Sequence, residues 1–267
     1  MDKTLLKHNI NADISGHLKY SEFSGSDANL LISEYAVDTP QLQSLSFIPS
    51  TSCTWIICYN TDNESSHFYC IGVIDSIMNL TLDGYTNYIF MTFNDDTYYI
   101  NNGISPASPA AFYNQLFEYS PESDSYEYSL TKELRSSLSV SDHVNMIKKY
   151  FDTTKYVLTF PENIGTIRAN IKKCHGNISV AHLAELSGYS VRQVNRIFTG
   201  YFGYGPKEYC KLLRFHKTLN EIVYDPIRSN SEFIQNIGYS DQSHFQREFK
   251  KLMGETPKQF IRSFLLS

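Results

Sequence analysis

Residues Gly238–Phe260 read GYSDQSHFQREFKKLMGETPKQF, and they repeat a pattern that occurs earlier in the chain. The earlier copy is GYSVRQVNRIFTGYFGYGPKEY, at Gly188–Tyr209. Both copies open on Gly-Tyr-Ser, carry a Phe near the middle and close on Gly-x-x-Pro-Lys-x-aromatic. Two copies are too few for a solenoid, so the pattern indicates one small module that the chain uses twice.

The first copy predicts a short helix, a tight turn and a second helix. Ser179 can cap the first helix, and Gly188 permits the positive φ that ends it. Ser190 can cap the second helix. Apolar residues recur at helical spacing in both helices, at Val180, Leu183 and Ala184 and then at Val194, Ile197, Phe198 and Phe202.

The second copy follows the same plan, with Ser240 as the expected cap of its second helix. The apolar stripe of that helix consists of Phe245, Phe249, Leu252 and Met253. Between the copies, Pro206 suits a first helical turn, and a helix of about 18 residues from there measures about 27 Å. Such a helix would hold the two modules about one turn of DNA apart, roughly 34 Å.

A helix, a turn with Gly and a second helix form the helix-turn-helix signature, whose second helix enters the major groove of DNA. Arg matches the O6/N7 edge of guanine, and Asn or Gln matches the N6/N7 edge of adenine. The sequence therefore predicts that the chain binds double-stranded DNA. The alternative, that both helix pairs serve packing alone, does not explain two matched copies. The candidate DNA-binding residues are Arg192, Gln193, Asn195 and Arg196 in the first module and Gln242, Ser243, His244, Gln246, Arg247 and Lys250 in the second.

The charge distribution supports this assignment. The chain carries a net charge of −5 over 267 residues. Residues 160–267 hold 15 Lys and Arg against 9 Asp and Glu, whereas residues 1–159 hold 8 against 19. A basic C-terminal half behind an acidic N-terminal half indicates that the second half binds nucleic acid.

The N-terminal half predicts a β-rich domain. Short runs of β-branched and aromatic residues alternate with Asp, Asn, Gly, Ser and Pro; the runs are ANLLISEYAV, CTWIICYN, FYCIGVI, YIFMTF and TYYIN. We expect a small barrel or sandwich. An amphipathic helix follows over 139–154, with Val140, Val144, Ile147 and Phe151 on one face, and another begins near Pro161.

The predicted fold class is therefore α+β. A small β-barrel domain with linker helices precedes an all-α domain of two helix-turn-helix units joined by a long helix. The expected boundaries are 1–135 for the β-rich regulatory domain, 136–160 for a helical linker that also serves dimerisation, and 161–267 for the DNA-binding domain.

Four aromatic residues are candidates for binding a small ligand inside the β-rich domain, since a small barrel can hold one: Trp55, Tyr59, Tyr69 and Tyr88. The alternative for each is ordinary core packing. Cys53, Cys58, His67 and Cys70 raise the question of a metal or a thiol switch, but their spacing fits no compact zinc unit. We expect no catalytic site, no metal and no cofactor.

Residues 178–264 resemble the DNA-binding domain of the AraC/XylS family of bacterial transcription regulators. The pattern that carries the resemblance is aromatic-x-x-x-Phe-Lys-Lys-x-x-Gly-x-x-Pro-x-x-aromatic, at Phe245, Phe249, Lys250, Lys251, Gly254, Pro257 and Phe260. The resemblance implies seven helices and asymmetric DNA sites read by one subunit. The chain departs from the family pattern at Asn230, where an aliphatic residue is usual, and at Ile234, where a small residue is usual. The N-terminal half is similar to the cupin-type domains that sense a signal or dimerise in this family.

The expected function is that of a cytoplasmic, one-component transcription regulator, an activator by the tendency of the family, with a small-molecule effector, RNA polymerase and a second copy of itself as partners. No apolar run is long enough to span a membrane. We expect the signal to reach the DNA-binding units through residues 140–175. One alternative is control by a protein partner or by dimerisation, without a small ligand. Another is a DNA-repair methyltransferase that carries the same module, but only three of the five cysteines lie in residues 1–159, and such enzymes need four.

Overall fold

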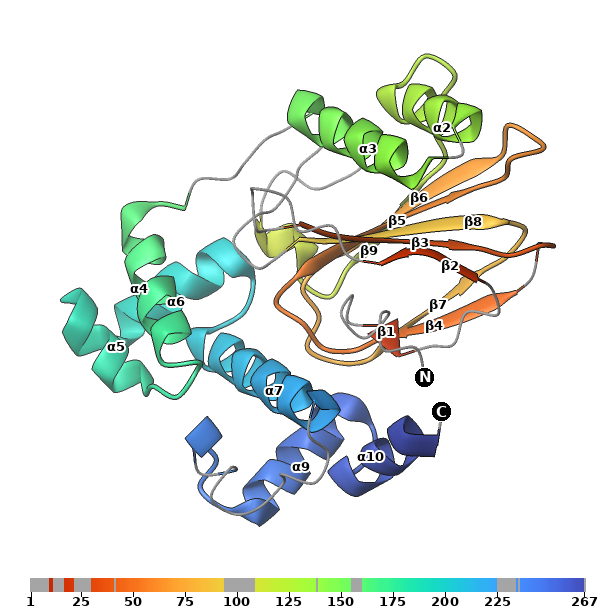
Figure 1. Cartoon of the computed structure of the whole chain (residues 1–267). Helices are drawn as coiled ribbons and strands as arrows, with labels where there is room; N and C mark the ends of the chain where they lie inside the picture. The colour runs from red at the N-terminus through yellow and green to blue at the C-terminus, as the bar shows by residue number, and fades with distance from the viewer. Residues whose placement is uncertain are drawn as a thin grey trace.

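A β-rich domain and a helical domain lie side by side in this chain (Figure 1). The computed structural model describes residues 10–11, 17–21, 30–40, 42–93, 109–137, 139–154, 160–224, 234 and 236–266. The strands are β1 (Ile10–Asn11), β2 (His17–Ser21), β3 (Leu30–Ala36), β4 (Gln43–Phe47), β5 (Cys53–Tyr59), β6 (Ser66–Ile71), β7 (Met78–Leu82), β8 (Asn87–Phe93) and β9 (Leu116–Tyr119), with a 3₁₀ turn η1 (Pro109–Phe112) before the last. The helices are α2 (Tyr126–Ser136), α3 (Val140–Thr154), α4 (Glu162–Lys173), α5 (Val180–Ser187), α6 (Val191–Phe202), α7 (Pro206–Tyr224), α9 (Gln242–Met253) and α10 (Pro257–Leu266).

The strands form two antiparallel sheets. One has the order β1-β4-β7 and the other the order β2-β3-β8-β5-β6-β9. The two central strands of the larger sheet, β5 and β8, are buried at every residue. A strand that is covered on both faces reads as a continuous apolar run instead of an alternating one, which explains CTWIICY and NYIFMTF. The predicted fold class, a β-rich domain followed by an all-α domain, is confirmed.

Alternate residues of the central strands enter two separate apolar clusters. Trp55 and Ile57 of β5 lie in the cluster that α2 and α3 cover, together with Leu130 and Ile147. The intervening Ile56 and Cys58 lie in the cluster between the two sheets. The larger sheet therefore separates two cores, with α2 and α3 on one face and the smaller sheet on the other (Figure 1).

Helix α2 is an element that the sequence patterns did not predict. The Ser125 side chain accepts a hydrogen bond from the Tyr128 backbone N–H and so caps the helix. Leu130 and Leu134, one turn apart, are buried against the sheet. Since α2 ends at Ser136, the proposed domain boundary at 135 falls within one residue of a helix end, but it stays a prediction.

The predicted helices of the C-terminal half that fall within the described residues are present, with one local correction. Ser179 and Ser190 cap α5 and α6, and Gly188 ends α5 at φ 70°. The cap of α9, however, is Asp241 and not Ser240. The carboxylate of Asp241 accepts the His244 backbone N–H at 2.7 Å, while the Ser240 hydroxyl hydrogen-bonds to the Asp241 side chain.

Some sequence expectations fall outside the described residues. These are the strand expected at TYYIN, residues 97–101, and the departure at Asn230. The other departure, Ile234, is helical and buried, as is Ile237. Six of the seven helices that the family resemblance implies have full bounds within the described residues, with further helical residues at 234, 236 and 237.

A buried ion pair joins α3 to the larger sheet. His143 Nδ1 lies 2.8 Å from Glu34 Oε2 on β3, and Tyr59 donates its hydroxyl to Glu34 Oε1 at 3.4 Å. His143 Nε2 lies 2.9 Å from the carbonyl oxygen of Leu134 and 3.0 Å from that of Ser137. Because both ring nitrogens face acceptors, only the imidazolium makes all these bonds. Burial alone lowers the pKa of His143, but the hydrogen bond and charge of Glu34, with the two carbonyls, raise it above 6.5 overall.

We expect this pair to make the stability of the chain pH-dependent. A His whose pKa rises on folding stabilises the folded state fully below its unfolded pKa, and the contribution is lost as the pH rises through the folded pKa. His143→Gln should therefore lower the free energy of unfolding at pH 6, by about 3 kcal/mol for a broken buried pair, and by progressively less at higher pH. Urea unfolding from pH 6 to 9 measures this. His182→Gln, on the exposed face of α5, is the matched control, and equal pH profiles for all three proteins would contradict the assignment.

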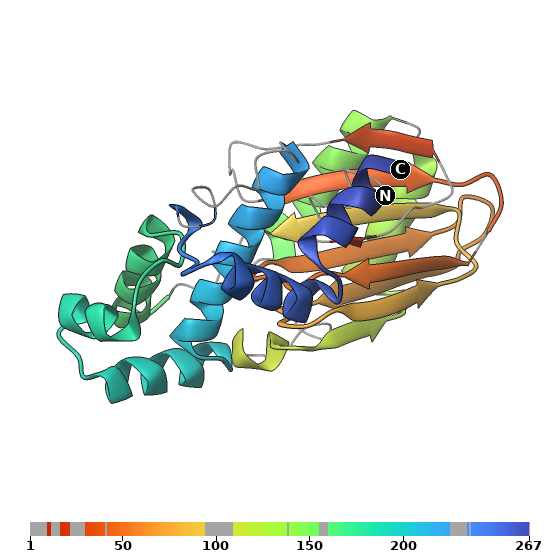
Figure 2. The ribbon, with the colours of Figure 1, turned by 90° about the horizontal axis from the view of Figure 1, so that it is seen from below.

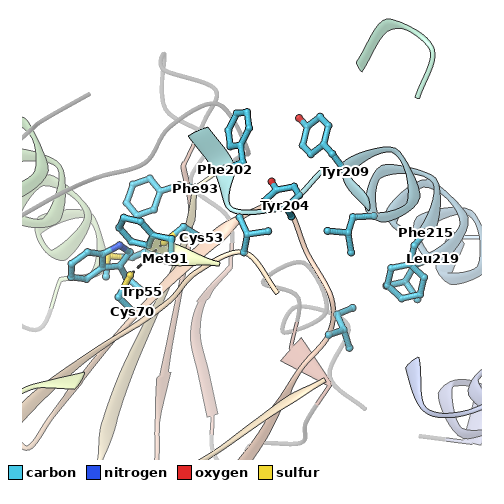
Figure 3. Close-up of a cluster of buried hydrophobic side chains, with 14 of the residues drawn as sticks. Cys53, Trp55, Cys70, Met91, Phe93, Phe202, Tyr204, Tyr209, Phe215 and Leu219 are labelled. Atoms are coloured by element: carbon cyan, nitrogen blue, oxygen red, sulfur yellow. Dashed lines mark hydrogen bonds between the residues drawn. The ribbon is translucent and has the colours of Figure 1, made fainter. Parts of the chain in front are cut away.

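The two domains share one apolar cluster. It runs from Trp55 and Phe93 on the sheet to Phe202, Tyr204 and Tyr209 in the helical domain (Figure 3). At the contact, the ring centroids of Tyr113 and Tyr204 lie 4.9 Å apart. The β-rich domain is therefore packed directly on the helical domain, beyond its connection through the chain.

Three further contacts fix this arrangement. The turn η1 packs on α6, where a Cβ on Gly203 would come 2.9 Å from the Ala110 carbonyl oxygen. His216 of α7 donates from Nε2 to the Pro49 carbonyl oxygen at 2.6 Å. Ile77 Cδ1 lies 3.4 Å from the position that a Cβ on Gly254 would take.

Gly203 offers a test of this contact, with Gly188 as its matched control. Both have positive φ, 80° and 70°, so alanine costs about 1 kcal/mol of backbone strain at either. Among the described residues, nothing lies within 4 Å of a Cβ on Gly188. Gly203→Ala should therefore lower the free energy of unfolding by about 1–3 kcal/mol more than Gly188→Ala, or separate the domains. Urea unfolding and the radius of gyration from X-ray scattering measure both effects, and equal results for the two variants would rule out the contact.

Candidate DNA interface

The first helix-turn-helix unit is built by its caps and its apolar faces. Ser190 and Gln193 form a capping box at the start of α6, where each side chain bonds to the backbone of the other. Val194 and Phe198 of α6 are buried, as is Leu183 of α5. This packing turns the opposite face of α6 toward solvent.

The solvent-facing side of α6 carries the candidates predicted from the sequence. Arg192, Asn195 and Arg196 are all exposed. Asn195 Nδ2 donates to the Val191 carbonyl oxygen at 2.9 Å, so its amide lies back along the helix. Gln193 is exposed too, but its Oε1 accepts from Ser190 in the capping box. In this conformation Gln193 shapes the start of the helix and has its acceptor already used.

The second unit presents a similar face on α9. Gln242, Ser243, Gln246, Arg247 and Lys250 are exposed, whereas Phe245, Phe249, Leu252 and Met253 are buried on the other side. His244 is half-buried, and its Nδ1 lies 3.2 Å from the Ser240 hydroxyl. The backbone N–H of His244 and the Ser240 hydroxyl lower the pKa of Asp241, so this cap is ionised at neutral pH. An ionised Asp at a helix N-terminus interacts favourably with the helix dipole and so stabilises the helix.

Val191 is an exposed residue that the sequence patterns did not select. It is the first residue of α6 and 45% exposed, next to the Asn195 amide that bonds to its carbonyl. The first residues of a recognition helix are those that reach base edges, and apolar side chains can contact the methyl group of thymine. The sequence did place Val191 directly after the expected cap Ser190, and this position could have identified it as a candidate for base contact.

Each unit therefore offers a helix that is capped at its start, buried on one side and polar on the other. Long helix α7 joins the two, with α4, α5 and α6 at its N-terminal end and α9 and α10 beside its C-terminal half (Figures 1 and 2). Residues 183–263 match the family model described as a helix-turn-helix domain. They form an AraC-type helix-turn-helix domain. This domain assigns DNA binding to the chain.

Solved structures with similar chain paths carry the AraC-type domain or are named ToxT. A lysine-to-alanine variant of apo ToxT from Vibrio cholerae strain SCE256 is 10% identical, with 87% of this chain and 97% of that chain covered and a TM-score of 0.49. Wild-type ToxT of the same strain, bound to an unsaturated fatty acid, is 11% identical, with 91% and 96% covered and a TM-score of 0.44. An AraC-type regulator from Chromobacterium violaceum is 20% identical, with 38% and 91% covered and a TM-score of 0.34. No curated protein sequence matches this chain significantly.

The four aromatic ligand candidates do not lie together. Trp55 is buried under α3, with its ring 6.2 Å from that of Phe151, and Tyr59 donates to Glu34 on the same side of the sheet. Tyr69 and Tyr88 lie in the cluster between the two sheets, where Tyr88 donates its hydroxyl to the Tyr85 carbonyl oxygen. A ligand between the sheets would therefore meet Tyr69 and Tyr88, and one under α3 would meet Trp55 and Tyr59.

The thiols of the β-rich domain are buried. Cys53 Sγ lies 3.4 Å from Cys70 Sγ, and burial, with Cys53, raises the pKa of the Cys70 thiol. Among the described residues, no three His, Cys, Asp or Glu side chains gather in a way that could hold a metal ion. Within the same residues, no helix is both long and apolar enough to cross a lipid bilayer.

Proposed function

We propose that this protein is a one-component transcription activator whose binding to DNA, or activation from it, is changed by a small molecule at the β-rich domain. It would act in the cytoplasm, as a homodimer, and in contact with RNA polymerase. The AraC-type domain supports the DNA-binding part of this proposal. Its regulatory part is carried by one observation, the place where the β-rich domain touches the recognition helices.

The β-rich domain contacts both recognition helices at their C-terminal ends. Gly203, which ends α6, packs on η1, and Gly254, which ends α9, faces Ile77. The candidate base-contacting residues lie on the exposed faces of the same helices. A change in the β-rich domain can therefore move the recognition helices while their DNA-facing surfaces stay uncovered.

These contacts offer a more direct route than the linker that the sequence suggested. The expected route ran through residues 140–175, of which 155–159 lie outside the described residues. The direct route uses Tyr113 and η1 on one side and Tyr204 and Gly203 on the other. Tyr113 donates its hydroxyl to Asp75, which lies two residues before Ile77. The segment Asp75–Ile77, which faces α9 at Ile77, is therefore joined through Tyr113 to the part of the β-rich domain that faces the end of α6.

The DNA-binding part predicts that two arginines read different parts of one site. Arg196→Ala and Arg247→Ala should each lower affinity by about 1–3 kcal/mol and relax base preference at one position. Selection of DNA sequences by the full chain, at fixed salt, measures both. Arg262→Ala is the matched control, since Arg262 is exposed on α10, outside both recognition helices; it should leave base preferences unchanged.

The positions in the DNA site at which each variant relaxes base preference show which units read bases. If Arg196→Ala and Arg247→Ala relax different segments of an asymmetric site, both units read bases. A protein that selects no sequence, with or without added small molecules, would refute the proposed function. If only Arg196→Ala has an effect, the second unit contacts phosphates and reads no bases there.

The regulatory part predicts a ligand that acts through the domain contact. A small molecule that binds only the folded β-rich domain, present at a free concentration of 100 times its Kd, should raise the free energy of unfolding by about 2.7 kcal/mol. This raises Tm by several degrees. The same compound should change the affinity for DNA. In Gly203→Ala the rise in Tm should persist and the change in DNA affinity should shrink. If no compound from a broad metabolite panel shifts Tm while DNA selection succeeds, control by a protein partner or by dimerisation is favoured instead.

A further inference from the structure

Arg214 contacts both helix-turn-helix units from the middle of the helix that joins them. Its Nη1 donates to the Gly176 carbonyl oxygen at 2.8 Å, in the loop between α4 and α5. Its Nη2 lies 3.5 Å from Glu248 Oε2 on α9. The side chains of Arg214 and Glu248 are only 15% and 11% exposed. One guanidinium thus joins the first unit, α7 and the second recognition helix.

The surrounding contacts place the two units directly against each other. The guanidinium carbon of Arg214 lies 5.8 Å from the ring centroid of Tyr239, in the turn before α9. Beside it, Gly238 adopts φ 102°, and a Cβ there would come 2.6 Å from Asn177 Cγ. The loop that precedes α5 therefore touches the turn that precedes α9.

A gain in stability alone does not explain the ion pair between Arg214 and Glu248. Arg214 Nε is buried and has no hydrogen-bond partner among the described residues. Ion pairs that are buried and incompletely bonded often cost as much as they contribute. Arg, however, presents a rigid planar fork of donors that fixes direction, which a Lys ammonium does not. Orientation is thus the property that this arrangement supplies best.

The network also reaches a candidate DNA-contacting residue. Glu248 Oε2 lies 3.8 Å from His244 Nε2, one turn earlier on α9. The position of Arg214 is therefore linked to the start of the second recognition helix as well as to the loop that precedes the first unit's helix pair.

We propose that Arg214 is a positioning residue that sets the spacing and the angle between α6 and α9, and hence the separation of the two DNA segments that the protein accepts. This inference rests on the proposed reading of DNA by both units. One inserted base pair moves the second segment by about 3.4 Å along the DNA and turns it by about 35°. A pair of units held rigidly loses contacts on such a site, whereas a pair that can shift recovers them.

The test compares the selected DNA site with the same site carrying one extra base pair between its two segments. The full-length wild type should lose roughly tenfold in affinity on the longer site, the usual cost of one lost base contact. Arg214→Met keeps an unbranched apolar stem and removes the fork, and it should lose less than about threefold in affinity on the longer site, as should Arg214→Lys. Lys211→Met is the matched control, because Lys211 pairs with Glu208 on the same helix at 2.7 Å; it should keep the wild-type penalty.

The readout is the ratio of affinities for the two sites. A uniform loss of stability or of positive charge lowers both affinities by the same factor and leaves this ratio unchanged. Circular dichroism checks that each variant is folded. If Arg214→Met does not fold, Glu248→Gln carries the test, since it weakens the same link and should lower the same ratio. An unchanged ratio in the folded variants, or a wild type that tolerates the extra base pair, would overturn the inference. Failure to select any site would instead count against the proposed function.

Discussion

The arrangement of the molecule depends on the packing of Phe202. This last residue of α6 is 1% exposed, and its ring lies within 4.5–6.3 Å of those of Phe198, Tyr204 and Tyr209. It ties the first recognition helix to the long helix α7. Because Tyr204 also packs against the ring of Tyr113, the same cluster attaches the β-rich domain. Loss of this packing would free the recognition helix and the domain contact together.

The helical half was largely predictable because its signals are local. Caps, a glycine with positive φ and a period of 3.6 residues each act within a few residues, and Ser179, Gly188 and Ser190 behave as their types predict. The one misplaced cap, Ser240 in place of Asp241, arose because both neighbours are good caps. The exposed faces of α6 and α9 follow from the same periodicity.

The β-rich half was predictable only in outline. Strands buried on both faces, such as β5, carry no alternation, so the sequence did not reveal that Trp55 and Cys58 enter different cores. Helix α2 is largely polar and short, and its burial depends on a sheet formed far away in the sequence. The contacts at Gly203, Tyr113 and His216 are also tertiary, and no periodicity in a single sequence predicts such contacts.

The positions of the domain contacts make each recognition helix a lever. Helix α6 has 12 residues, so it is about 18 Å long, and the β-rich domain touches it at the end opposite to its cap. A tilt of about 10° around that end would displace the start of the helix by about 3 Å, close to the rise of one base pair. A displacement of that size separates a helix that is in register with its bases from one that is not. Very small rearrangements of the β-rich domain would then suffice to switch affinity for DNA.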